Sequence, residues 1–365
     1  MGSYDVAIVG AGMAGAGLAA FAAPHARILI LEAEDRPGVH ATGRSAAFWN
    51  ESYGGPGVRP LTTASGPWLR AGGYLRPRGA LHLGRPQDQA ALDALEAAFA
   101  SSVVIGPVDP ADRVPGLKPP WTRALWEPSC ADIDVARLHA DLLATAAVSG
   151  AVVQVRAGLK SAERRGDGWR IATAAGTVEA RLLVNAAGAW ADEVAALAGA
   201  RPIGIRPYRR TIAQLRVDPP VPPDLPLVID VGGRFYFKPD VGGRLWLSPH
   251  DETACAAGDA AAEELDVAVA IDRLQRVVDW RVERVEHRWA GLRSFSPDRL
   301  PVYGFAAEAP GFFWCAGQGG FGIQTAPAAS AMAAALLLGR PPDPVAAGID
   351  PKRYLPDRFE DGGRK

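Results

Sequence analysis

The chain has 365 residues, 48% of them apolar, and its 39 basic and 40 acidic side chains give a formal net charge of −1. This length and apolar content exclude a fibrous or largely disordered protein and predict one large or two closely associated globular domains. The near-zero net charge gives no electrostatic reason to expect nucleic acid or an anionic membrane as a partner.

Cysteine usage and the amino-terminal pattern bear on the compartment. Cys130, Cys255 and Cys315 lie far apart and outside any CxxC pair, which fits a reducing compartment. Residues 1–9 lead directly into a strand without a signal-peptide pattern, and no apolar run approaches the roughly 20 residues that span a bilayer. We therefore expect a cytoplasmic protein. The six histidines show no metal-ligand spacing, so we expect no metal.

The strongest pattern is a strand, a glycine turn and a helix at the amino terminus. Residues 4–9 form a β-rich apolar run, residues 10–15 read GAGMAG, and residues 16–23 form a helix of small residues. A second buried strand, residues 27–31, ends at Glu32. This order and spacing predict a dinucleotide-binding fingerprint.

Each element of the fingerprint has a physical role. Gly10 permits the tight turn, Gly12 lets the backbone approach a pyrophosphate, and Gly15 lets the helix pack closely on the sheet. The helix amino terminus offers free N–H groups to phosphate. Glu32 would accept hydrogen bonds from the adenosine ribose and would repel a 2′-phosphate. The fingerprint therefore fits FAD or NAD and disfavours NADP.

Later segments extend this cofactor site. Residues 40–47 are small and polar and could open a second helix against phosphate and a polyol chain, and residues 181–190 read as a buried strand followed by a small-residue turn. Residues 312–317 predict another strand, residues 318–322 a glycine loop and residues 323–338 a helix. The junctions predict one sheet built from discontinuous segments around an extended cofactor. Because the sequence contains a single fingerprint, we expect no second, NAD-binding module. Electrons would then pass from the bound cofactor to oxygen or a membrane-side acceptor.

Seven stretches in chain order resemble the FAD-dependent amino-acid and amine oxidoreductases of the D-amino acid oxidase (DAO) family. This family includes glycine oxidase, sarcosine oxidase and bacterial D-amino acid dehydrogenases, and the chain is most similar to the D-arginine dehydrogenase subgroup. The matching stretches are TGRSAA at 42–47, YG at 53–54, ADID at 131–134, NAAGAW at 185–190, FYFKP at 235–239, WAGLRSF at 289–295 and QGGFGIQT at 318–325.

The resemblance implies an α/β, two-domain fold. A glutathione-reductase-like, FAD-binding Rossmann domain would be combined with a mostly antiparallel substrate domain. The FAD-binding segments would be 1–74, 131–208 and 289–345, the substrate segments 75–130 and 209–288, and the tail 346–365. Turn-rich sequence with short strand-like runs in 75–128 and 211–287 allows this division.

We expect a non-covalent FAD, because the fingerprint is intact and no cysteine lies in a recognisable attachment motif. The fingerprint and the resemblance together imply a set of residues that contact it. These are Gly10, Gly12, Met13, Ala14, Gly15, Glu32, Ala33, Thr42, Gly43, Arg44, Ser45, Ala46, Val153, Ala187, Gly188, Trp190, Arg293, Gly319, Gly320, Gly322, Ile323 and Gln324. Sarcosine-type relatives can attach flavin covalently, but Cys315 falls inside a predicted strand, where a buried structural cysteine is expected.

The substrate-binding residues follow from residue type and from the resemblance together. Arg293 follows a strand predicted to end near Trp289, and a guanidinium can bind a carboxylate through two hydrogen bonds. Arg209 and Arg210 would point to opposite faces of a strand, and the resemblance favours Arg210 as the second cation. A solvated surface position is the alternative reading for all three.

Other side chains complete the predicted site. The resemblance implies that Tyr236 binds the carboxylate, that Tyr53 is part of a lid, and that Gly320 and Gln324 contact the amine and the flavin region. Ordinary sheet packing is the alternative for Tyr236.

The side-chain pocket departs from the D-arginine subgroup. Phe48 stands where that subgroup has an ionisable residue, and residues 78–80 lack its acid, so Phe48, Trp49 and Tyr53 predict an apolar or aromatic pocket. Water, Tyr53 or His82 could take the amine proton, although His82 alternates with apolar neighbours as a packed strand histidine does.

The reaction that follows is oxidation of a D-amino acid by hydride transfer from the α-carbon to flavin N5. The imino acid formed would hydrolyse to a 2-oxo acid and ammonia. A glycine- or sarcosine-type amine or a 2-hydroxy acid is an alternative substrate, and a flavin-binding protein without turnover is an alternative function. The acceptor would be oxygen, a quinone or another oxidant, with a peripheral membrane acceptor possible and no dedicated protein partner.

Overall fold

A parallel sheet surrounds the amino-terminal strand in the computed structural model, which describes residues 4–359. Strand β1 (Tyr4–Val9) pairs in parallel with β2 (Ile28–Leu31) and with β12 (Gly176–Asn185). Strand β9 (Val152–Gln154) extends the sheet beyond β2, and β20 (Phe312–Ala316) pairs in parallel with β12. Segments far apart in the chain therefore form one sheet, as the sequence predicts.

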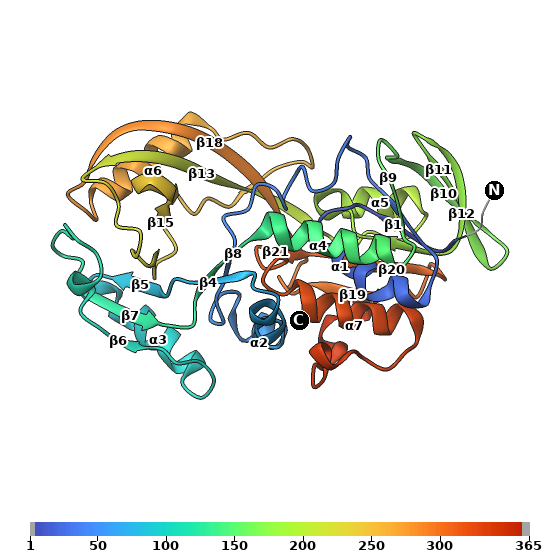
Figure 1. The fold of residues 1–365 in the computed structure, drawn as a ribbon, viewed down its shortest axis with the longest axis horizontal. Coiled ribbons are helices and arrows are strands. Elements are labelled where there is room, and N and C mark those ends of the chain that lie inside the picture. The colour runs from blue at the N-terminus through green and yellow to red at the C-terminus, as the bar shows by residue number, and fades with distance from the viewer. Residues whose placement is uncertain (1–3, 360–365) are drawn as a thin grey trace.

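The side chains of β1 point alternately to the two faces of this sheet, and both faces are buried. Val6 and Ile8 pack in a core with helices α1 (Met13–Ala22) and α7 (Ala326–Leu338), whereas Ala7 and Val9 pack on the opposite side. On that opposite side lie α5 (Ala191–Leu197) and the hairpin of β10 (Leu159–Arg165) and β11 (Gly168–Thr173), which continues the same sheet because β11 pairs antiparallel with β12. Helix α4 (Val135–Val148) and strand β19 (Val302–Phe305) complete this part, at the right of Figure 1.

The second sheet has ten strands and lies at the other end of the elongated molecule (Figure 1). All of its neighbouring strands are antiparallel except β14 and β5, which are parallel. Its strands are β21 (Gln318–Gly319), β18 (Arg281–Phe295), β13 (Arg206–Asp218), β16 (Arg244–Ser248), β15 (Tyr236–Asp240), β14 (Leu227–Asp230), β5 (Ala80–Gly84), β7 (Arg123–Glu127), β6 (Gly106–Pro107) and β17 (Thr253–Ala254). The fold is thus a mixed α/β fold of two domains, and the second sheet is mostly antiparallel. The exact boundaries of the six predicted segments stay a prediction.

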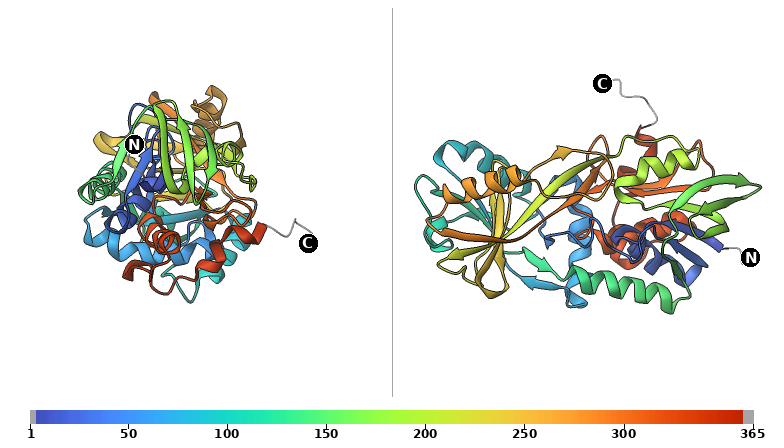
Figure 2. Two further views of the ribbon diagram at one scale, coloured as in Figure 1. Left: turned by 90° about the vertical axis from the view of Figure 1, so that its right-hand side faces the viewer. Right: turned by 90° about the horizontal axis from the view of Figure 1, so that it is seen from above.

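The ribbon of β13 and β18 links the two ends of the molecule. These long strands pair from Arg206 opposite Phe295 to Asp218 opposite Arg281, and Figure 2 shows them running from the second sheet toward the first. Helices α6 (Glu264–Gln275) and α3 (Gln89–Phe99) pack against the second sheet.

A small third sheet lies between the two large ones. Strand β8 (Ala131–Ile133) is its centre, with β3 (Phe48–Trp49) and β4 (Leu75–Pro77) on either side. Helix α2 (Gly55–Ala71) connects β3 to β4 and packs against α7.

Three local predictions are wrong. Residues 40–44 form hydrogen-bonded turns rather than the start of a helix, with the Gly43 N–H donating to the Gly38 carbonyl. Strand β18 does not end near Trp289 but continues to Phe295, because β13 pairs with it along its whole length. Helix α7 begins at Ala326 instead of 323, next to Pro327, whose fixed φ suits a first helical turn. Within residues 4–359, no helix is long and apolar enough to cross a membrane.

Candidate active site

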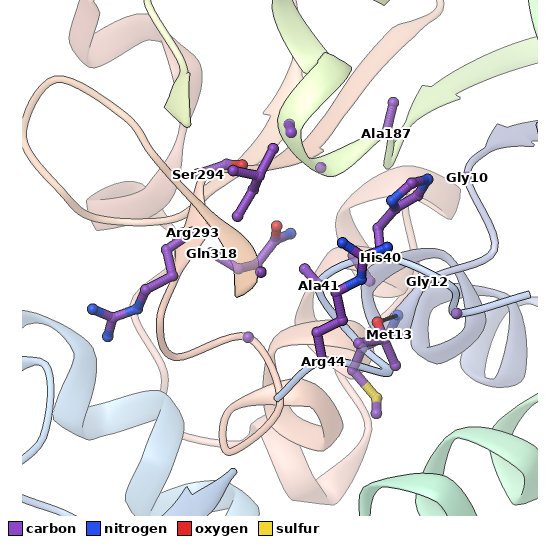
Figure 3. A pocket seen from close by; sticks show the side chains of 18 of the residues that line it. Gly10, Gly12, Met13, His40, Ala41, Arg44, Ala187, Arg293, Ser294 and Gln318 are labelled. Atoms are coloured by element: carbon purple, nitrogen blue, oxygen red, sulfur yellow. Dashed lines mark hydrogen bonds between the residues drawn. The ribbon is translucent and has the colours of Figure 1, made fainter. Parts of the chain in front are cut away.

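A cavity of about 470 Å³ extends from the amino-terminal glycine turn to the second sheet. Figure 3 shows Gly10, Gly12 and Met13 at one side of it, and Arg293, Ser294 and Gln318 at the other. The cavity therefore lies where the two domains meet.

The glycine turn supplies the cofactor end of the cavity. Gly10 has φ +102°, and a Cβ there would lie 2.5 Å from the Ala186 carbonyl oxygen. A Cβ on Gly15 would lie 1.9 Å from the Gly10 carbonyl oxygen, so this glycine serves helix packing. By contrast, a Cβ on Gly12 would meet only the Thr42 hydroxyl, at 3.3 Å. The protein itself thus leaves the space in front of Gly12 open for a close backbone contact with a phosphate.

Hydrogen bonds fix the residues around this turn. Glu32 is buried, and its carboxylate accepts hydrogen bonds from the backbone N–H groups of Ala11 at 2.9 Å and Glu34 at 3.0 Å. The Thr42 hydroxyl accepts one from the Met13 N–H at 2.9 Å. The acid that the fingerprint requires therefore also ties the end of β2 to the glycine turn.

Arg44 lines the cavity, but its guanidinium also holds a loop of the substrate side. It donates to the carbonyl of Ala260 at 2.8 Å and to that of Ala290 at 3.2 Å, and it forms an ion pair with Asp259. This side chain therefore connects the cofactor end to the loop that follows β16.

Most of the predicted residues line this one cavity. They are Gly10, Gly12, Met13, Ala14, Glu32, Ala33, Thr42, Arg44, Ser45, Ala46, Tyr53, Ala187, Gly188, Trp190, Arg210, Tyr236, Arg293, Gly319, Gly320, Gly322, Ile323 and Gln324. Gly15, Gly43 and Val153 are not among them. Gly43 supports the turn, since a Cβ there would lie 2.6 Å from the Gly38 carbonyl oxygen, and Val153 pairs with Ile30 in the sheet.

His40 lines the cavity and belongs to the predicted cofactor segment 40–47, but it was not singled out as a site residue. Its Nε2 lies 2.8 Å from a Glu34 carboxylate oxygen, its ring packs on Trp190, and its buried Nδ1 has no hydrogen-bond partner. An orphaned buried nitrogen in the wall of a cavity is typical of a ligand site. Its position just before the TGR motif is the sequence feature that could have indicated this role. Gly158, Leu159 and Glu193 also line the cavity and carry no such signal.

Two arginines line the cavity at the end away from the glycine turn. Arg210 is 6% exposed and lines the cavity, whereas its neighbour Arg209 does not line it and forms ion pairs with Glu263 and Asp266. Burial lowers the pKa of Arg210, and burial together with the charge of Arg299 lowers the pKa of Arg293. Holding these two charges away from water is costly, and an anion in the cavity would stabilise them.

Aromatic side chains enclose this end. Phe48 contacts Tyr53 and Tyr236, with ring centroids 5.0 and 6.3 Å apart, and Tyr53 also contacts Phe321 at 5.1 Å. Burial raises the pKa of Tyr236 despite the charge of Arg210, so its hydroxyl stays protonated and able to donate. The prediction that Trp49 joins this wall is wrong. Trp49 is 1% exposed and donates to the Thr62 carbonyl, because adjacent residues of β3 point to opposite faces.

Gln324 and Gly320 position their neighbours. The Gln324 amide donates to the Tyr53 carbonyl at 3.1 Å and to the Thr62 hydroxyl at 3.0 Å, and it accepts from the Asn50 N–H at 3.1 Å. A Cβ on Gly320 would lie 1.9 Å from an Arg293 nitrogen. Gln324 thus holds the segment that carries Tyr53, and Gly320 leaves the space that Arg293 fills.

His82 belongs to a buried network behind the same segment. It contacts the fully buried Glu127 carboxylate at 3.1 Å, and the Ser52 hydroxyl donates to that carboxylate at 2.6 Å. His82 does not line the cavity. The strand-packing interpretation of His82 therefore fits the structure better than a catalytic one.

Other reactive groups offer no separate centre. Cys315 is buried in β20, where burial raises its thiol pKa to about 12. In the part of the chain from Tyr4 to Phe359, no group of three or more His, Cys, Asp or Glu side chains could hold a metal.

Comparison with known proteins agrees with this geometry. Residues 5–336 match the family model described as FAD dependent oxidoreductase. The chain is 30% identical over 258 residues to glycine oxidase from Pseudomonas aeruginosa, which covers 67% of this chain and 64% of that protein. It spans 35% and 64% of the length of the first two curated relatives that it matches.

Solved structures show the same fold. Glycine oxidase from Geobacillus kaustophilus has a TM-score of 0.84 at 22% identity and covers 97% of this chain and 98% of its own. L-Proline dehydrogenase from P. horikoshii has a TM-score of 0.85 at 20% identity and covers 100% and 99%. The chain belongs to the FAD dependent oxidoreductase family, and FAD is its cofactor.

Replacing Gly12 separates cofactor binding from folding. We expect Gly12→Val to lower the FAD content of the purified protein at least about tenfold, because the added methyl groups would occupy the space of the pyrophosphate. Gly15→Val is the contrasting variant and should reduce the yield of folded protein, since its Cβ meets the Gly10 carbonyl. Absorbance of bound flavin and thermal unfolding measure the two effects. A normal FAD content in folded Gly12→Val protein would contradict this assignment.

The Glu127 network should contribute acid-sensitive stability. Burial raises the Glu127 pKa, but the hydrogen bond and charge of His82 and the hydrogen bonds of Ser52 lower it below its usual value. This contribution is complete above the unfolded carboxyl pKa of about 4.3 and is lost as the pH falls through the folded value. Glu127→Gln should lose about 1–3 kcal/mol at pH 7 and show a weaker decline at acid pH.

Denaturant unfolding at several pH values measures this effect. Glu163→Gln is the control, because Glu163 forms an exposed ion pair with Arg165. An unchanged acid limb in Glu127→Gln would show that the network does not depend on the ionised carboxylate.

Proposed function

We propose that this protein oxidises a D-amino acid with an apolar side chain to its imino acid, which then hydrolyses to a 2-oxo acid and ammonia. The observation that carries the proposal is the pair of guanidiniums, the buried Arg210 and the 12% exposed Arg293, at the end of the FAD cavity away from the glycine turn. FAD, when bound, supplies the acceptor for the hydride of the substrate α-carbon.

The chain's own residues bind and orient the substrate. Arg293 and Arg210 hold its carboxylate, and the protonated hydroxyl of Tyr236 donates to the same group. Fixing the carboxylate limits where the α-carbon can lie in the cavity, and such positioning is what a hydride transfer would require. Tyr53 covers the substrate, and its segment is held by Gln324 and Asn50. Water or Tyr53 takes the amine proton.

The aromatic wall supports an apolar side chain on the substrate. Phe48, Tyr53 and Tyr236 form this wall, whereas the carboxylates that line the cavity, Glu32, Glu34 and Glu193, come from the cofactor side. A cationic side chain would lose its hydration there without gaining a partner from the wall.

A glycine- or sarcosine-type amine is the second candidate substrate. It is favoured by the similarity to proteins named glycine oxidase, and it would use the same arginines. A 2-hydroxy acid would also present a carboxylate. We further propose that FAD is held non-covalently and that the protein is cytoplasmic. The electron acceptor is oxygen, a quinone or another oxidant.

Arg293 should contribute to turnover without affecting the cofactor. We expect Arg293→Lys and Arg293→Ala to lower kcat/KM by about two powers of ten or more, equivalent to about 3 kcal/mol, because both lose the two-pronged contact with carboxylate. FAD content should stay the same. Arg209→Lys is the matched control, since Arg209 pairs with acids outside the cavity. Full activity of Arg293→Ala would remove the carboxylate assignment.

A substrate series tests the reaction class. Anaerobic loss of flavin absorbance should be fastest with D-amino acids that have apolar side chains, and slower with D-Arg and D-Lys. L-Amino acids, N-methylglycine and 2-hydroxy acids form the comparison set. Preference for N-methylglycine would favour the second candidate, preference for D-Arg would contradict the apolar pocket, and no bleaching by any compound would indicate a protein without turnover.

A further inference from the structure

An acidic loop lies against the arginine-rich part of the cavity wall. Residues 249–263 connect β16 to α6, and within them β17 pairs with β13 at Tyr208 and Arg209. Asp251 in this loop accepts hydrogen bonds from the Thr211 N–H at 2.7 Å and hydroxyl at 3.0 Å. The loop is thus anchored to the strand that carries Arg210.

Glu252 of this loop contacts both arginines of the substrate end. One of its carboxylate oxygens lies 3.2 Å from an Arg293 nitrogen and 3.4 Å from an Arg210 nitrogen. The same carboxylate binds Arg299 through both oxygens, at 2.9 and 3.0 Å. Glu252 itself is not a lining residue of the cavity, and its side chain is 36% exposed.

We infer that Glu252 takes the place of the substrate carboxylate when no substrate is bound, and that it thereby determines which ligands can enter. This inference rests on the proposed function, in which Arg210 and Arg293 bind the substrate carboxylate. Among the described residues, Glu252 is the acid with which Arg293 forms an ion pair. A ligand carboxylate that uses both guanidiniums must therefore displace Glu252 or share them with it.

The surroundings of Glu252 make displacement possible. Arg299 is 48% exposed and lies outside the cavity, so Glu252 keeps a cationic partner when it leaves Arg210 and Arg293. Arg293 has no such reserve, because Glu252 is the acid with which it forms an ion pair among the described residues and its side chain is only 12% exposed. Arg210 keeps a weaker partner, since its Nε lies 3.9 Å from an Asp251 carboxylate oxygen and donates to the Asp251 carbonyl at 2.8 Å. Only a ligand that carries its own carboxylate can replace Glu252 without leaving the charge of Arg293 unpaired.

Glu252 is therefore a specificity-determining residue. An amine without a carboxylate would not displace Glu252 from the arginines and would gain no binding energy from them. An amino acid, by contrast, replaces the Glu252 carboxylate with its own. Displacing Glu252 lowers the affinity for every ligand. The loss of affinity is smallest for ligands whose carboxylate can contact both guanidiniums.

Calorimetric titration of the FAD-loaded protein with sodium propionate tests the inference. Propionate carries the carboxylate without the amine, so binding is measured without turnover. Glu252→Gln should bind propionate at least about fivefold more tightly than wild type, because the competing charge is removed. Glu252→Asp keeps the charge but shortens the side chain, and should bind propionate with intermediate affinity.

Glu286→Gln is the matched control. Glu286 is also a carboxylate of this sheet that is shared by three arginines, Arg216, Arg244 and Arg284, but it lies at the far end of the β13 and β18 ribbon. Its replacement should leave propionate affinity unchanged. Arg293→Ala should weaken propionate binding in both the wild-type and Glu252→Gln backgrounds.

The outcomes separate this inference from the proposed function. Equal or weaker propionate binding by folded, FAD-loaded Glu252→Gln and Glu252→Asp, with binding still dependent on Arg293, would overturn the role of Glu252 alone. Such a result would indicate that Glu252 organises the arginines. Propionate binding that is independent of Arg293 would instead contradict the carboxylate site on which the proposed function depends.

Discussion

The removal of two guanidinium groups from most of their contact with water is the constraint on which the second-sheet end of the cavity depends. A guanidinium out of water needs an anion nearby, and Arg210 and Arg293 meet that need through a loop acid that lies beside the cavity rather than within it. The antiparallel pairing of β13 and β18 brings the two side chains together, although 83 residues separate them in the chain (293 − 210 = 83). The sheet thus concentrates positive charge, and the loop after β16 balances it.

The cofactor half depends on close backbone packing instead of charge. The carbonyl of Gly10 lies where any side chain on residue 15 would be, so strand β1 and helix α1 can approach only as far as glycine allows. Glu32 and Thr42 then secure the turn through backbone N–H groups of Ala11 and Met13. The site for the phosphates is rigid because its walls are main chain.

The sequence predicted what local pattern determines and missed what tertiary pairing determines. The fingerprint at residues 10–15 and the strands ending at Val9 and Leu31 follow from periodicity and glycine spacing. Which of Phe48 and Trp49 faces the cavity depends on the pairing of β3 with β8, which neither residue type reveals. Likewise, nothing near Arg293 in the chain indicates that Glu252 or a continued strand lies beside it. His82 and Glu127 meet only because β5 and β7 pair.

The discontinuous lining of the cavity has a consequence for biosynthesis. The glycine turn emerges from the ribosome first, but β20 and the loop with Gly320 and Gln324 are made only after some 300 further residues (320 − 12 = 308). Until then β12 lacks its parallel partner and the segment that carries Tyr53 lacks its hydrogen bonds to Gln324. A nascent chain that ends before this point lacks part of the cavity wall. Cofactor binding therefore follows the synthesis of nearly the whole polypeptide.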